Sequence, residues 1–306
     1  MARFAIGRKI PVSPAQPGPA TRDDRLARLA PALPGAVALF LLFIAPMAFM
    51  LVFSFWRTDV DFNLVPDWNL NNYTKFFTVP TYIRTFVKTL LMAAAVTAAG
   101  LAAALPFTYF LVRYVSRRWQ RLVLLAVIVP FWTSYLLRVY AWQAILGEFG
   151  VLNQVLQGLG ILSEPSRLFV YNDIAVFIVL VYVYFPFAAL ALYAALEKFD
   201  FNQLHAAQDL GARPDQALRY ILVPQIRAGI ITACIFMFIP ILGEFLTPTL
   251  VGGVQGSLIA NLVVNFFRGA QIAQGAAFAI LIAVFVTALL VIFRKYLRIE
   301  DVVARG

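Results

Sequence analysis

Six apolar runs, each long enough to cross a lipid bilayer, constrain the fold of this chain more than any other feature. A membrane-spanning helix needs about 20 apolar residues, and in lipid the backbone polar groups must be satisfied within the helix itself. Hydrophobic residues make up 62% of the 306 residues and charged residues only 13%, about half the share found in soluble domains. The sequence predicts an all-α polytopic membrane protein with six transmembrane helices, roughly Leu33–Trp56, Thr89–Val112, Leu122–Leu146, Ile174–Leu196, Ile226–Leu250 and Ala276–Phe293.

Basic residues indicate on which side of the membrane each loop lies, because short cytoplasmic loops retain Lys and Arg. The segment 1–32, the loops after the second and fourth runs, and the C-terminal tail are basic. The alternate loops are poor in base around Asp59–Asp67, Glu148–Arg167 and Gly252–Gln271. We therefore expect both termini in the cytoplasm, with residues 1–32 as a cytoplasmic tail and residues 33–306 as a six-span domain. The net charge of +10 does not indicate nucleic-acid binding, because the basic residues are scattered at the ends of the apolar runs.

The cytoplasmic loop at about 200–224 begins with the pattern of a short helix. Asp200 or Asn202 can cap its start. Leu204, Ala207 and Leu210 recur along one face at helical spacing. The loop therefore presents an amphipathic helix to the cytoplasmic mouth of the protein.

A tight turn and a second short helix are expected to follow. Gly211 falls where a left-handed C-terminal cap is needed. Pro214 suits the first turn of the next helix, where Asp215 stabilises the positive helix end. Pro224 is expected to mark the break before the fifth span.

This loop resembles the EAA loop of ABC-importer membrane subunits, which has Glu-Ala-Ala, a glycine four residues after the second alanine, and an Ile-x-x-Pro-like ending. The matching positions here are His205, Ala206, Ala207, Asp209, Gly211, Ile221 and Pro224. The resemblance implies that the first helix couples transport to a cytoplasmic ATPase by docking into a groove on it. His205 stands where the family usually has glutamate. The alternative is an amphipathic helix that rests on the lipid headgroups.

Two further stretches look like segments of the spermidine/putrescine importer permeases. They are "PFWTSYLLRVYAWQAILGEFGVLN" (Pro130–Asn153) and "GEFLTPTLVGG" (Gly243–Gly253). The resemblance implies a type I ABC-importer permease fold in a bacterial inner membrane. It also implies a heterodimer with a second permease subunit, two cytoplasmic ATPase subunits that bind ATP and magnesium, and an extracytoplasmic substrate-binding protein. No cofactor is expected in this chain.

Two charged residues, Glu244 and Arg138, lie inside apolar runs, where a charge costs at least about 2.5–3.5 kcal/mol at the bilayer centre. Counting about 1.5 Å per residue from the cytoplasmic ends of their runs places them at a similar depth. They either form a structural ion pair, reach the outer headgroups, or border a water-filled path.

Aromatic residues favour the path, because their faces attract desolvated cations. Those near Arg138 are Trp132, Tyr135, Tyr140 and Trp142, and Tyr182 and Tyr184 lie in the fourth run. We assign Glu244, Arg138, Trp132, Tyr135 and Tyr182 to a substrate path. The expected solute is a small organic cation of the putrescine or spermidine type, with an amino acid derivative or opine as the alternative.

Prolines in three runs predict helix breaks, which are common where transporter helices line a path. Pro130, Pro186 and Pro240 are expected to interrupt the third, fourth and fifth spans, and Gly243, Gly252 and Gly253 to loosen the end of the fifth.

The sequence offers little for catalysis within this chain. It has one cysteine and one histidine, which gives a metal cluster or a histidine-based triad nothing to build on. It also lacks the G-x-x-x-x-G-K-[ST] phosphate-binding loop. A stand-alone, ion-coupled secondary transporter is the remaining alternative, and the EAA-like loop argues against it.

Overall fold

The computed structural model describes residues 33–297, so the predicted tail 1–32 lies outside the described residues, as do residues 298–306. The chain divides into two compact units, Met1–Phe49 and Met50–Gly306. The described part of the first unit is helical, with α2 (Leu33–Leu39), the π-helix η2 (Phe40–Ile44) and the beginning of α3 (Ala45–Ser54). Its large apolar side chains are mostly exposed, as expected for a helix whose solvent is lipid.

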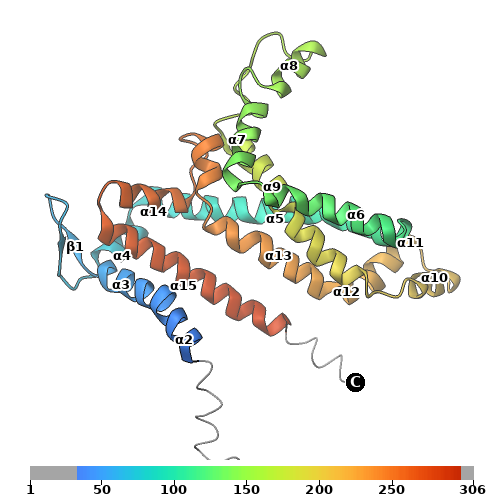
Figure 1. Cartoon of the computed structure of the whole chain (residues 1–306), viewed down its shortest axis with the longest axis horizontal. Helices are drawn as coiled ribbons and strands as arrows, with labels where there is room; N and C mark the ends of the chain where they lie inside the picture. Colours follow the sequence, from blue (N-terminus) through green and yellow to red (C-terminus); the bar gives the residue numbers. More distant parts are fainter. Residues whose placement is uncertain (1–32, 298–306) are drawn as a thin grey trace, which may run out of the picture. The chain divides into compact units, whose positions relative to one another are not determined.

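Three long helices form the core of the second unit. They are α5 (Pro80–Tyr114), α9 (Asp173–Leu196) and α13 (Arg227–Leu242), and each packs on the other two (Figure 1). Small residues allow the close approach of α9 and α13, because a Cβ atom at Gly229 would collide with Ala195.

The helix α15 (Ile272–Leu297) packs against α13, α14 (Ile259–Arg268) and α4 (Asn71–Thr78). Edge-to-face aromatic contacts hold this side together, with Phe278 at 4.9–5.1 Å from the rings of Phe76, Tyr82 and Phe266.

A departure from the all-α prediction lies between α3 and α4. There β1 (Arg57–Thr58) and β2 (Leu64–Val65) form a short antiparallel hairpin that pairs Arg57 with Val65 and Thr58 with Leu64.

The third predicted span is broken, as Pro130 indicated. It consists of α6 (Arg117–Ile128), the 3-10 turn η3 (Val129–Trp132) and α7 (Tyr135–Leu146), with a bend of 95° at the break. Beyond α7, the short helix α8 (Val151–Gly158) belongs to the arm that projects from the helical body in Figure 1.

The other two predicted breaks have different outcomes. The prediction of a break at Pro186 is wrong, because α9 runs through this proline without interruption. The fifth span ends at Leu242, two residues after Pro240, and becomes helical again as η5 (Pro248–Gly252).

The second half of the EAA-like loop forms one helical run that leads into the fifth span. After α10 (Asn202–Asp209), this run comprises α11 (Pro214–Ala217), the π-helix η4 (Leu218–Leu222) and α12 (Val223–Gln225). It meets α13 at a bend of 70°. Within residues 33–297, four helices are long and apolar enough to span a membrane, and the number rises to six if each bent pair is one span. The four are Val37–Ser54, Pro80–Tyr114, Asp173–Leu196 and Ile272–Phe293.

Candidate functional site

The turn after α10 has the geometry that the sequence predicted. Gly211 has a φ of +92°, in the region that only glycine adopts readily. The amide of Gly211 donates to the carbonyl of Gln208 at 2.9 Å, and that of Ala212 donates to the carbonyl of Ala207 at 3.0 Å. These two bonds form a Schellman motif, which satisfies the last carbonyls of α10 and turns the chain sharply.

The structure differs from the sequence prediction at two places in this loop, the start of α10 and the bend after α12. The carboxylate of Asp200 accepts from the amide of Asn202 at 3.0 Å, but the residue at the cap position is Phe201, whose side chain makes no capping bond. The expected cap at Asp200 or Asn202 is therefore not found. Pro224 does not mark the break, since it lies inside α12 and the chain bends at Ile226. The π-helix Leu218–Leu222 precedes this proline and relieves the clash that its ring would make in a regular α-helix.

The predicted apolar face of α10, formed by Leu204, Ala207 and Leu210, is only partly buried. Leu204 is buried, in a cluster with Leu196, Phe199, Leu222 and Ile226. Leu210 is 90% exposed, because α10 ends at Asp209 and the cap residue turns away from that face. Ile221 and Ala207 are half-buried against the same cluster. The helix is therefore anchored at Leu204 and offers Leu210 to the outside.

Side-chain contacts tie α10 to two other elements. The ring of His205 contacts the guanidinium of Arg113, near the end of α5. Gln225 of α12 donates to Gln203 of α10. Ala206 and Asp209 remain exposed on the outer surface of the helix. His205 thus faces α5, and the surface left free for a partner includes Ala206, Gln208, Asp209 and Leu210.

The second site is the carboxylate of Glu244, which is 8% exposed at the break of the fifth span. Its Oε1 accepts from the amides of Leu246 and Thr247 at 2.9 and 3.1 Å. Its Oε2 accepts from the hydroxyls of Tyr135 and Tyr184 at 2.7 and 3.1 Å. The carboxylate caps the helical turn that follows it, and two other spans supply the hydroxyl donors.

Thr247 extends this network by one further bond. Its Oγ1 lies 2.6 Å from the hydroxyl of Tyr135. Because Tyr135 has a single hydroxyl proton and gives it to Glu244, Thr247 is the donor in this pair. Neither Thr247 nor the bond from Tyr184 was assigned from the sequence, although the Glu-x-x-Thr spacing resembles a helix-start signal.

The segment 243–258 has irregular backbone on both sides of η5, and the amide side chains of the buried Asn261 and the half-buried Gln143 bond to it. Asn261 donates to the carbonyl of Phe245 at 2.8 Å and to Thr249 Oγ1 at 2.9 Å. Gln143 donates to the carbonyl of Leu250 at 2.8 Å. Irregular backbone at membrane depth is tolerated only where protein or a water-filled cavity surrounds it, so these ties hold the broken span in place.

Arg138 does not pair with Glu244, and the described part of the chain contains no carboxylate within 4.0 Å of its guanidinium. The guanidinium instead lies over the rings of Phe131 and Tyr135, at 4.6 and 5.6 Å from their centroids. Its Nε is buried without a hydrogen-bond partner. Of the alternatives set out above, the structural ion pair is therefore wrong.

The other two predicted path residues, Trp132 and Tyr182, lie in different surroundings. Tyr182 and Trp142 lie together, with ring centroids 5.2 Å apart, and line a cavity of about 450 Å³ that Arg138 also borders. Trp132 is 81% exposed and Tyr140 is 47% exposed, so neither is enclosed with the carboxylate. The structure thus joins Tyr135 to Glu244 and places Tyr182 beside Arg138.

The projecting arm beyond α7 is held by local polar contacts. The buried Asn153 donates to the carbonyls of Gly147 and Ser166, each at 2.9 Å. At the surface, Arg167 donates to Glu148 at 2.7 Å, and this hydrogen bond and charge raise the pKa of the guanidinium. Within residues 33–297, no group of three or more His, Cys, Asp or Glu side chains is arranged to hold a metal ion.

Comparisons with known proteins show the family to which this chain belongs. Residues 95–299 match the family described as "Binding-protein-dependent transport system inner membrane component", and the chain belongs to this family. It is an inner-membrane permease of the ABC-importer class, as the EAA-like loop predicted.

Individual relatives indicate to which members of this family the chain is similar. The chain is 35% identical to the spermidine/putrescine transport system permease protein PotB of Escherichia coli K12 over 231 residues, which cover 75% of this chain and 83% of PotB. It is 33% identical to the inner membrane ABC transporter permease protein YdcU of the same organism over 289 residues, covering 87% and 91% of the two chains. A crystal structure of a bacterial ABC transporter that imports the acidic polysaccharide alginate shares the fold, with a TM-score of 0.69, 17% identity and coverage of 90% and 96%.

Proposed function

We propose that this permease subunit forms the translocation path of an ATP-driven importer for a small organic cation of the putrescine or spermidine type. The observation that carries the proposal is the environment of Glu244. This buried carboxylate accepts four hydrogen bonds, all from neutral donors, and no cationic side chain in the described residues pairs with it. The name of the relative PotB supports the same class of solute.

An organic ammonium complements this site in charge and in shape. Burying a carboxylate is costly unless hydrogen bonds or an opposite charge compensate. The four donors hold the side chain in one orientation, and the arriving cation supplies the missing charge. The rings of Tyr135 and Tyr184 border the carboxylate, and aromatic faces stabilise a desolvated cation by about 2 kcal/mol.

ATP hydrolysis in the partner subunits would act on the solute site through the packing contacts between α10 and the start of α13. ATPase subunits that dock on Ala206, Asp209 and Leu210 would displace α10 when they close. Leu204 packs with Ile226 at the start of α13, so the displacement would reach that helix. The 16 residues of α13 lead to Glu244, about 24 Å away. A movement at the cytoplasmic loop can therefore alter the carboxylate site.

The partners follow from the same class. We propose that the working complex contains a second, different permease subunit, two cytoplasmic ATPase subunits that bind ATP and magnesium, and a soluble binding protein that delivers the solute from outside. A second structure of the alginate importer, solved in complex with a periplasmic protein that carries an alginate pentasaccharide, illustrates such an assembly.

One observation favours a second candidate solute class. The guanidinium of Arg138 borders a cavity of about 450 Å³ and has no carboxylate partner in the described residues. An amino acid derivative or opine carries both an ammonium group for Glu244 and a carboxylate for Arg138. A diamine has no carboxylate, so Arg138 would keep its contacts with the rings of Phe131 and Tyr135.

The experiment reconstitutes this chain with its neighbouring subunits and binding protein in lipid vesicles and measures ATP hydrolysis for each solute. Stimulation by putrescine or spermidine supports the proposal, and stimulation by an opine alone favours the second candidate. A response only to neutral or purely anionic solutes contradicts both. Transport by this chain alone, driven by an ion gradient, would show a secondary transporter instead.

A further inference from the structure

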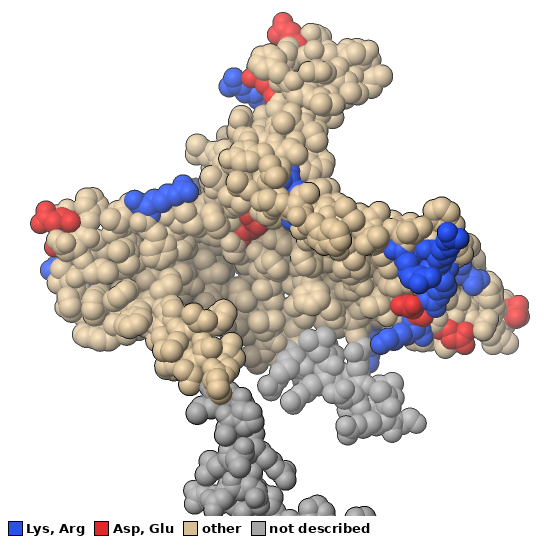
Figure 2. Space-filling model, in the orientation of Figure 1, with Lys and Arg blue, Asp and Glu red and all other residues tan. Residues whose placement is uncertain are grey.

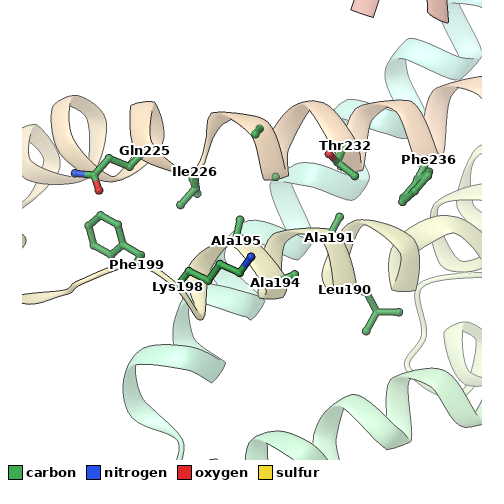
Figure 3. A pocket seen from close by; sticks show the side chains of 12 residues that line it. Leu190, Ala191, Ala194, Ala195, Lys198, Phe199, Gln225, Ile226, Thr232 and Phe236 are labelled. Atoms are coloured by element: carbon green, nitrogen blue, oxygen red, sulfur yellow. The ribbon is translucent and has the colours of Figure 1, made fainter. Parts of the chain in front are cut away.

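A groove of about 600 Å³ lies between α9 and the bent pair α12–α13, away from the carboxylate site. We name it the hinge groove, because Ile226 at the bend forms part of its wall. Small residues make it hollow, among them Ala194 on α9 (Figure 3). Gly229 on α13 also lines it. The groove shares Phe199, Gln225 and Ile226 with the contacts that anchor α10, but none of its lining residues belongs to the carboxylate site.

The two ends of the hinge groove differ in polarity. Lys198 and Gln225 lie at the end next to the EAA-like loop, and Leu190 and Phe236 lie at the other end (Figure 3). The six residue steps from Leu190 to Leu196 correspond to about 9 Å along α9, and Lys198 lies two residues beyond the end of this helix. If the positive-inside rule gives the orientation, the polar end lies at the cytoplasmic surface and the apolar end reaches into the membrane.

Lys198 is a free cation at the polar end. Its neighbour Glu197 pairs with Arg117, and no carboxylate in the described residues lies within 4.0 Å of the Lys198 ammonium. Figure 2 shows Lys and Arg side chains gathered at this end of the second unit. Arg121 and Arg227 also have no acidic partner in the part of the chain that is described. The local charge therefore favours an anion.

We infer that the hinge groove binds an anionic phospholipid of the cytoplasmic leaflet. The phosphate group pairs with the ammonium of Lys198, and an acyl chain follows the apolar wall towards Phe236. Basic pockets between helices on the cytoplasmic side suit anionic headgroups, and the apolar continuation distinguishes a lipid from a free phosphate. A lipid in this place braces the 70° bend on which the coupling between α10 and α13 depends.

The test measures lipid retained by the purified complex of this chain and its partner subunits, after exchange into nanodiscs with equal amounts of phosphatidylglycerol and phosphatidylethanolamine. Mass spectrometry counts both lipids after release. The inference predicts selective retention of phosphatidylglycerol, and a decrease of about fivefold in Lys198→Gln. Ala194→Phe, which fills the groove without changing charge, should cause a similar loss. Arg121→Gln removes the same charge outside the groove and should retain phosphatidylglycerol as the unaltered chain does.

Three results would overturn the inference. Equal loss in Arg121→Gln and Lys198→Gln would mean that general surface charge attracts the lipid. Full retention in both groove variants would place the lipid elsewhere. A photoreactive amino acid at position 194 that captures the second permease subunit, and no lipid, would make the groove a subunit interface. Cross-linking of phosphatidylglycerol at position 194, with inorganic phosphate unable to compete, supports the lipid.

Discussion

At the level of single residues, Glu244 depends on neighbours that come from two other spans. Tyr135 begins α7 and Tyr184 lies in the middle of α9, and both hydroxyls donate to the same carboxylate oxygen. Because the site has no internal cation, these donors decide how firmly the carboxylate is held before a solute arrives.

Removing one tyrosine hydroxyl should loosen the carboxylate. We expect Tyr135→Phe and Tyr184→Phe each to lower the free energy of unfolding by about 1 kcal/mol and to reduce solute-stimulated ATP hydrolysis. Tyr135→Phe should have the larger effect, because it also leaves Thr247 without its acceptor. Thermal unfolding and ATPase assays of the reconstituted complex measure both quantities. Tyr140→Phe, on the same helix, is the control, and an equal loss in this variant would contradict the assignment.

The residues of the site were only partly predictable from the sequence. Glu244 and Arg138 could be found because a charge in an apolar run is costly, and Tyr135 because it lies close to Arg138 in sequence. Their arrangement could not be predicted, because the 95° bend of the third span decides which side chains of α7 meet the segment after α13. Pairing of Arg138 with Glu244 was plausible from depth alone, yet the guanidinium lies on Phe131 and Tyr135 instead.

At the level of elements, the turn after α10 was predictable and the course of the spans less so. Gly211 followed from a local rule about helix ends, which needs no tertiary information. Pro130 and Pro186 carry the same local signal, but only Pro130 coincides with a break. Pro186 is buried in α9, where packing against α5 and α13 maintains the helix despite the missing hydrogen bond. Proline alone therefore does not predict a break in a packed span.

The Schellman turn gives a graded prediction for position 211. A β-branched residue at a φ of +92° is strained, and the left-handed region costs an ordinary residue about 1–2 kcal/mol. We expect Gly211→Val to reduce co-purification of the ATPase subunits and transport, and Gly211→Asn to retain most of both, because Asn tolerates this conformation. Affinity purification with quantified ATPase measures the effect. If Gly211→Val couples normally, the turn does not position α10 for docking.

The close approach of α9 and α13 gives a stability prediction. Gly229→Val places side-chain atoms against Ala195 and should cost about 1–3 kcal/mol, with a lower thermal midpoint. Gly158→Val is the matched control, because no atom lies within 4 Å of a Cβ at that position. Thermal unfolding in detergent compares the two. A midpoint for Gly229→Val equal to that of the control would mean that the two helices are farther apart than described.

At the level of the whole molecule, composition predicted a polytopic membrane protein with six apolar segments. The structure contains four long spans, or six with the bent pairs counted, at positions close to those expected. The length of α5, with 35 residues, exceeds its predicted span because its ends are polar and carry no hydropathy signal. The hairpin β1–β2 was missed because two-residue strands leave no periodic pattern.

The predicted orientation can be measured with single cysteines in a Cys234→Ala background. Asp61 and Gln208 are both exposed and lie in loops that the positive-inside rule assigns to opposite sides. We expect a membrane-impermeant maleimide to label Asp61→Cys in intact cells, or in cells with only the outer membrane opened. Gln208→Cys should react only after the inner membrane is permeabilised. The reverse pattern would invert the molecule and remove α10 from the cytoplasm.

The most direct test of the account is uptake of labelled putrescine or spermidine into vesicles that contain the complete importer with Glu244→Gln. The amide keeps the size of the side chain and removes the charge that the solute is proposed to meet. Loss of a buried charge partner predicts a decrease in uptake on the order of a hundredfold, with unchanged ATPase association. The thermal midpoint should fall only slightly, because the amide NH2 replaces one of the two accepting oxygens that the four donors share. Glu164→Gln, an exposed position on a loop that the positive-inside rule assigns to the outside, should transport normally. Normal uptake by Glu244→Gln would contradict the account and leave Glu244 as the cap of a helical turn.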